Sequence, residues 1–168
     1  MKNNLILIGL PGAGKSTVGV LLAKMRLMHF LDTDLLIQTN EGMALSEIIA
    51  KAGKKEFLTL EDKTLSSLAA ENTVIATGGS AVYGEGAMAH LATLGRVIYL
   101  KIGFETLSAR VGDLDARGVV GKAASDLAGI WQERIPLYER YADLTVSAEF
   151  DRPEMAALAI IEALGEDL

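Results

Sequence analysis

Hydrophobic and polar residues along this 168-residue chain are grouped in blocks that predict strands alternating with helices. Short, continuous apolar runs rich in β-branched residues are typical of strands buried on both faces. Such runs predict five strands, at 5–8, 28–31, 73–76, 96–100 and 144–146. Helical spacing of apolar residues predicts helices at 16–27, 35–39, 44–51, 57–70, 87–94, 105–111, 124–141 and 153–164, the seventh interrupted or bent near Pro136. We expect Gly95 to end the helix at 87–94, and Asp151 to cap the last helix.

This alternation predicts an α/β fold, in which a parallel sheet is covered by helices on both faces as a three-layer α/β/α sandwich. Ligands in such folds bind beyond the carboxyl ends of the strands. Polar clusters at 9–16, 32–34 and 77–80 each follow a predicted strand. We therefore expect them to converge on one crevice. The length suits a single domain, residues 1–168, and we see no repeat or linker.

The segment from Gly9 to Ser16 reads GLPGAGKS and matches the phosphate-loop pattern G-x-x-x-x-G-K-[ST] in full, between a predicted strand and a predicted helix. Glycines let successive backbone N–H groups converge on a phosphate, and the helix N-terminus adds partial positive charge there. Lys15 is expected to reach the β- and γ-phosphates, and the Ser16 hydroxyl to bind Mg²⁺. The simpler alternative is a glycine-rich turn, but the context favours nucleotide binding.

Composition excludes several classes of function. The net charge of −6 argues against a nucleic-acid partner or an anionic membrane surface. The chain has no cysteine, so disulfides and thiolate chemistry are excluded. No apolar run is long enough to span a bilayer, and a cleaved signal would remove the phosphate loop. We expect a cytoplasmic monomer that acts on a small molecule.

Two carboxylates follow the second predicted strand, and a glycine turn follows the third. Strand alternation would place Asp32 and Asp34 on one side of the chain. One could bind Mg²⁺ through water, and the other could orient or deprotonate a substrate hydroxyl. A helix cap with solvated acids is the alternative. Gly78 and Gly79 would let a ligand approach the backbone closely, although a simple tight turn remains possible.

Three arginines lie in or near the glycine-rich segment 112–124, which we expect to be a mobile lid. They are Arg110, Arg117 and Arg134. Phosphoryl transfer spreads negative charge over the γ-phosphate oxygens, and an arginine on a closing lid can neutralise it. Each of them, taken singly, could also be an ordinary solvated surface charge.

Taken together, these motifs make the chain resemble the shikimate kinases nearly end to end. The motifs are the phosphate loop, Asp32-Thr33-Asp34, Thr77-Gly78-Gly79, Arg117 in the lid, and Arg134-Ile135-Pro136-Leu137-Tyr138. The resemblance implies a P-loop NTPase fold of the nucleoside-monophosphate-kinase-like type with a five-stranded parallel sheet. It further implies transfer of the γ-phosphate of ATP, with Mg²⁺, to a hydroxyl of shikimate in aromatic amino acid biosynthesis. Residues 32–62 would form the substrate-binding region.

The resemblance also implies a role for each site residue. The catalytic residues would be Lys15, Asp34 and Arg117. Those binding the nucleotide would be Gly12, Ala13, Gly14, Lys15, Ser16, Thr17, Arg110, Arg117 and Pro153. Substrate would bind to Asp34, Gly78, Gly79 and Arg134, the last through the substrate carboxylate. The metal ligands would be Ser16 and Asp32.

The chain departs from the family pattern at three places. Leu58 stands where the family usually has an arginine that pairs with the substrate carboxylate, and Ser80 replaces the third glycine of the turn. The lid reads RGVV rather than RPLL. Lys54, Lys55 or Arg140 could supply the missing charge. Otherwise the acceptor is another hydroxylated metabolite, or the protein binds nucleotide with little turnover. The absence of arginine from 35–70 argues against a nucleoside monophosphate kinase.

Overall fold

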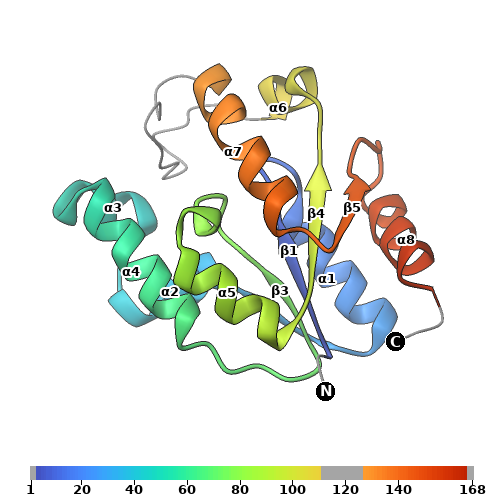
Figure 1. Ribbon diagram of the computed structural model, residues 1–168, viewed down its shortest axis with the longest axis horizontal. Coiled ribbons are helices and arrows are strands. Elements are labelled where there is room, and N and C mark those ends of the chain that lie inside the picture. Colours follow the sequence, from blue (N-terminus) through green and yellow to red (C-terminus); the bar gives the residue numbers. More distant parts are fainter. Residues whose placement is uncertain (1–2, 111–126, 166–168) are drawn as a thin grey trace.

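The computed structural model describes residues 3–110 and 127–165, and it contains the expected parallel sheet with five strands. The strands are β1 (Asn4–Ile8), β2 (His29–Asp32), β3 (Thr73–Ala76), β4 (Gly95–Lys101) and β5 (Leu144–Ser147). Their order across the sheet is β2-β3-β1-β4-β5, and every pairing is parallel. All carboxyl ends therefore lie at one edge, the upper edge in Figure 1.

Helices cover both faces of this sheet (Figure 1). The described helices are α1 (Lys15–Arg26), α2 (Thr33–Glu41), α3 (Leu45–Ala52), α4 (Lys54–Ser66), the 3₁₀ turn η1 (Ala81–Tyr83), α5 (Glu85–Leu94), α6 (Phe104–Arg110), α7 (Leu127–Tyr141) and α8 (Pro153–Leu164). Helices α1 and α8 pack side by side on one face, and α4, α5 and α7 lie on the other. The three-layer α/β/α prediction is confirmed.

The hydrophobic core follows from this layering. The apolar run of β1 is fully buried because helices cover both of its faces. A second, smaller apolar cluster is separate from the main core. It joins α2, α3 and α4 through Ile37, Ile48 and Phe57. These three helices thus form a separate packing unit beside the carboxyl edge of the sheet. There they can shape a binding site.

One predicted helix end was correct, and several other predicted boundaries were wrong. Gly95 is the C-cap of α5, as predicted, and it also opens β4, where a Cβ would overlap the backbone of Asn4 on the neighbouring strand. Asp151 does not cap α8; the cap position is Arg152, and its side chain makes no capping hydrogen bond. The helix expected at 57–70 begins at Lys54 and ends at Ser66. The helix with Pro136 runs unbroken from Leu127 to Tyr141.

In the described ranges, no helix combines the length and the apolar character that crossing a bilayer requires.

Candidate active site

The phosphate loop wraps around the amino end of α1 as the sequence predicts. Gly14 holds the cap position with φ 86°, a left-handed conformation that suits glycine. Gly9 passes close to the end of β4, so that a Cβ there would lie 2.7 Å from the Leu100 carbonyl oxygen. Glycine is thus required twice, once for conformation and once for close approach.

Lys15 is folded over its own loop. Its Nζ donates hydrogen bonds to the carbonyl oxygens of Gly9 at 2.7 Å and Leu10 at 2.9 Å. The side chain is only 8% exposed, and burial lowers the pKa of Lys15 to about 8, although Asp34 and Asp32 counteract part of this effect. The ammonium group therefore lies at the loop with little water around it, where it can bind a phosphate oxygen.

Asp32 joins the loop to the second strand. The Ser16 hydroxyl donates to Asp32 Oδ2 at 2.5 Å, while Asp32 Oδ1 accepts from the backbone N–H groups of Asp34 and Leu35 at 3.0 and 3.2 Å. The chain turns into α2 directly after Asp32, so the expectation of strand alternation through Asp34 was wrong. Asp32 therefore caps α2 with one carboxylate oxygen and binds Ser16 with the other. The two interpretations of Asp32, as a helix cap and as a residue of the site, are compatible.

The pair of Ser16 and Asp32 fits Mg²⁺ in one specific way. Among the described residues, no group of three or more acidic or histidine side chains could hold a metal ion by itself. Mg²⁺ keeps several waters and is usually bound by one or two protein oxygens together with substrate phosphates. A hydroxyl and a carboxylate 2.5 Å apart beside a phosphate loop match that requirement.

Asp34 points from the first turn of α2 into the same cavity. Burial raises its pKa to about 6, Lys15 acts in the opposite direction, and Asp32 adds to the increase. A carboxylate with a pKa just below neutrality is mostly ionised at pH 7 and can still accept a proton. It therefore suits a general base.

The glycine turn after β3 forms the floor of the cavity. A Cβ at Gly78 would lie 2.6 Å from both Asp34 Oδ1 and Glu61 Oε1, so Gly78 fits between two carboxylates. A Cβ at Gly79 would lie 2.9 Å from Arg134 Nη1. No side chain larger than hydrogen fits at Gly78 without displacing Asp34 or Glu61, which explains the glycine there.

Arg134 enters the cavity from α7 and is only 1% exposed. Its Nε donates to the Tyr83 hydroxyl at 3.2 Å, and the guanidinium lies 5.2 Å from the centre of the Tyr83 ring. Within the described part of the chain, Arg134 Nη2 has no hydrogen-bond partner. A buried guanidinium with an unused donor is well suited to bind an anion such as a carboxylate.

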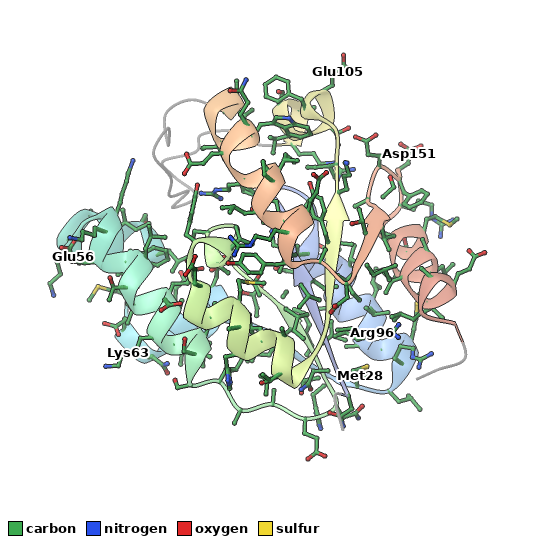
Figure 2. The ribbon with its side chains drawn as sticks, in the orientation of Figure 1. Met28, Glu56, Lys63, Arg96, Glu105 and Asp151 are labelled. Carbon is green, nitrogen blue, oxygen red and sulfur yellow. The ribbon has the colours of Figure 1, made fainter. Side chains whose placement is uncertain are left out.

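Lys15, Asp34, the glycine turn and Arg134 line one cavity of about 400 Å³ at the carboxyl edge of the sheet. Its lining comprises Pro11, Gly12, Gly14, Lys15, Ser16, Thr17, Asp34, Leu45, Phe57, Thr77, Gly78, Gly79, Ser80, Arg110 and Arg134. The expected convergence of the three polar clusters is confirmed. Arg96, labelled in Figure 2, marks the opposite end of β4, far from this cavity.

A second hollow of about 280 Å³ adjoins the phosphate loop. Arg110 and Pro153, predicted to flank a base, both line it, as does Ala13. The Arg110 guanidinium lies 3.4–3.5 Å from the carbonyl oxygens of Gly12, Ala148 and Phe150. Asp151, labelled in Figure 2, lies just before α8 and also lines this hollow.

Arg117 and the segment 112–124 lie outside the described residues. None of Lys54, Lys55 and Arg140, the candidates to replace the missing arginine, lines the described cavity. The two lysines are exposed at the start of α4, and Arg140 lies over the ring of Tyr141.

Three residues at the site, Glu61, Tyr83 and Tyr138, have no role predicted from the sequence. Glu61 is 1% exposed, and it lies on the buried face of α4, one turn from Phe57 and one turn from Leu65. Tyr138 donates from its hydroxyl to the Gly79 carbonyl oxygen at 2.6 Å and stacks on Tyr99. A charge in the middle of an apolar helical stripe was the available signal for Glu61.

Comparisons with known proteins find similarity to shikimate kinases. The family model described as shikimate kinase matches residues 11–165. A shikimate kinase of Thermobifida fusca is 39% identical over 161 residues, which cover 95% of this chain and 93% of that protein. A shikimate kinase from Acinetobacter baumannii, solved in complex with shikimate, superposes with a TM-score of 0.86 at 30% identity, covering 99% of this chain and 95% of that one. The corresponding structure from Aquifex aeolicus gives a TM-score of 0.84 at 32% identity, covering 96% and 95%.

Proposed function

This chain belongs to the shikimate kinase family, and we propose that it transfers the γ-phosphate of MgATP to a hydroxyl of shikimate. The observation that carries the proposal is one cavity in which Lys15 on the phosphate loop faces Asp34 and the buried Arg134. A phosphate site, a base and an anion-binding group then border the same space.

The phosphate loop and Lys15 bind and orient the phosphates. Backbone N–H groups at the start of α1 point toward the anion, and the Lys15 ammonium offsets the charge on the transferred group. Ser16 and Asp32 would hold Mg²⁺, which when bound would supply positive charge that offsets the negative charge of the phosphates. Arg110 and Pro153 flank the base of the nucleotide, and Arg117 acts on the phosphates from the segment outside the described residues.

On the acceptor side, Arg134 pairs with the carboxylate of shikimate, and the Gly78–Gly79 turn allows the ring to approach the backbone. Asp34 accepts the proton of the attacking hydroxyl, and the hydroxyl oxygen forms its bond to the γ-phosphorus as the bond to the leaving ADP oxygen breaks. The buried position of Asp34 keeps its basicity high enough for this task.

The test is a coupled assay of ADP release with MgATP and millimolar shikimate, with Lys15→Ala as the blank. We expect shikimate-dependent release that disappears in the variant. ATP binding without shikimate-dependent release would overturn the proposed acceptor.

Leu58 favours one second candidate, a kinase of the same type for a different hydroxylated acceptor. Its side chain is half-buried against the apolar cluster of Ile37, Ile48 and Phe57, and it does not line the cavity. Among the described residues, the acceptor side thus has no arginine at the position that the family uses for a carboxylate. A screen of hydroxylated metabolites with and without a carboxylate, in the same assay, separates the two candidates.

We further propose that the protein acts as a cytoplasmic monomer without a nucleic-acid partner. The net charge of −6 and the lack of cysteine support this proposal. Sedimentation velocity at assay concentration tests the monomer.

A further inference from the structure

The buried carboxylate of Glu61 lies directly behind the floor of the acceptor site. Glu61 is 1% exposed, and its Oε1 would be 2.6 Å from a Cβ at Gly78. No described residue donates a hydrogen bond to that Oε1. A carboxylate in such a place is costly unless a donor or a cation accompanies it.

Ser80 provides the donor. Its hydroxyl donates to Glu61 Oε2 at 2.6 Å, and both side chains are buried. Ser80 is also one of the positions at which this chain departs from the glycine of its family. Glycine has no hydroxyl, so a family member with glycine there must satisfy the buried carboxylate in another way.

Position 58 offers that other way. Residues 58 and 61 are three apart on α4, so their side chains are neighbours on the helix surface, and an arginine at 58 could pair with Glu61. Leucine at this position instead packs against the small apolar cluster with Ile48 and Phe57. The loss of a cation at 58 and the gain of a hydroxyl at 80 therefore concern the same carboxylate.

We propose that Leu58 and Ser80 are one linked exchange, in which the Ser80 hydroxyl takes over the support of Glu61 that an arginine at position 58 would give. Ser80 is then a positioning residue that acts through Glu61 on the Gly78–Gly79 turn. Of the two described arginines that line the cavity, Arg110 lies beside Gly12 and Arg134 beside Gly79. The exchange leaves Arg134 as the guanidinium on the acceptor side. This last step rests on the proposed function, whereas the exchange itself does not.

A double-mutant cycle tests the proposal, with Ser80→Ala measured in the Leu58 protein and in the Leu58→Arg variant. Alanine removes the hydroxyl without the added backbone freedom of glycine. Urea unfolding gives the stability, and steady-state kinetics give the KM for each substrate. Ser67→Ala removes an exposed hydroxyl near the end of the same helix and serves as the matched control.

In the Leu58 protein, we expect Ser80→Ala to increase the unfolding equilibrium constant by about tenfold, because a buried carboxylate loses its donor. The acceptor KM should rise while the KM for ATP stays unchanged. With arginine at position 58, the same substitution should change both quantities by less than about twofold, since the cation now supports Glu61. Ser67→Ala should leave both KM values unchanged.

The proposal would be overturned if Ser80→Ala changed the unfolding equilibrium constant and the acceptor KM by the same factors in the two backgrounds, because unlinked residues contribute additively. Should Leu58→Arg not fold, Leu58→Lys supplies a smaller cation, and Leu58→Met is the neutral control that should leave the cost of Ser80→Ala intact. The unfolding cycle uses no acceptor. Its failure is therefore distinct from failure of the proposed function, which would appear as absent shikimate-dependent ADP release in the unmodified protein.

Discussion

The nucleotide side and the acceptor side of the cavity are built in different ways. The nucleotide side comes largely from consecutive residues 9–17, whose backbone forms the loop and the start of α1. The acceptor side combines single side chains from α2, α4 and α7 with the turn after β3. A site made from backbone tolerates little change, whereas a site made from separate side chains can exchange them one at a time.

The positions of two of the three departures fit this difference. The phosphate loop matches its pattern in full, while Ser80 lines the acceptor side and Leu58 lies on α4 beside it. The third departure, in the segment with Arg117, lies outside the described residues.

The charges of the two sides also interact. The basic groups of Lys15 and Arg134 and the acidic groups of Asp34 and Glu61 are all largely buried around the same turn. Two basic groups and two acidic groups, whose pKa values burial raises, lie together there, so a change in one alters the field at the others.

Removal of Lys15 from the nucleotide side should have the largest effect. Lys15→Met keeps an unbranched side chain of similar length but removes the charge that stabilises the transferred phosphoryl group. We expect kcat to fall by about 10²- to 10³-fold or more, as for the loss of one charge-stabilising donor. The measurement is ADP release at saturating shikimate. A variant with near-normal kcat would contradict the role given to Lys15.

The corresponding change on the acceptor side is Arg134→Met. Loss of the buried partner of a carboxylate costs about 2–5 kcal/mol, which corresponds to a rise in the acceptor KM of roughly 30-fold to several thousand-fold. The KM for ATP should change little. Arg134→Lys retains the charge without the planar fork, and we expect an intermediate value. If the KM for ATP rose as much as that for the acceptor, the division into two sides would fail.

On the acceptor side, Glu61 should make the stability of the protein depend on pH. Burial raises the pKa of Glu61 to about 7 from 4.5. Between these values the folded protein keeps a proton that the unfolded chain has lost, so stability falls as pH rises through this window. Glu61→Gln should therefore gain about 3 kcal/mol relative to the unmodified protein between pH 4 and pH 8.

Urea unfolding at several pH values measures this gain. Glu56→Gln, on the outward face of the same helix in Figure 2, is the control and should show no comparable trend. A gain for Glu61→Gln that does not vary with pH would mean that Glu61 does not titrate in this window.

Restoring the family cation should have the smallest effect. Leu58→Arg adds a charged donor at the edge of the acceptor side. We expect the KM for shikimate to fall by about tenfold, which corresponds to the weakest hydrogen bonds that involve a charged group. The KM for ATP is the internal control. An unchanged or higher acceptor KM would favour an acceptor without a carboxylate.

Local patterns in the sequence determined the order of strands and helices and the nucleotide side of the site. The run before Gly9 and the motif through Ser16 are contiguous, so their geometry follows from backbone rules alone. Strand β3 and helix α8 have the predicted bounds, because the pattern that defines each of them also lies in contiguous residues. The sequence also marked Leu58 and Ser80 as departures, but not that they concern one carboxylate.

Tertiary structure alone decided which distant side chains share the acceptor side. Glu61 and Arg134 each lie in the middle of a buried helical stripe, with Phe57 and Leu65 on one helix and Ile130 and Tyr138 on the other. The spacing shows that such a charge faces inward, but its partner depends on how α4, α7 and the turn after β3 pack together. Lys54, Lys55 and Arg140 were plausible substitutes by charge, and packing placed all three away from the cavity. Local sequence sets the backbone, whereas the pairing of buried charges depends on contacts between residues far apart in the chain.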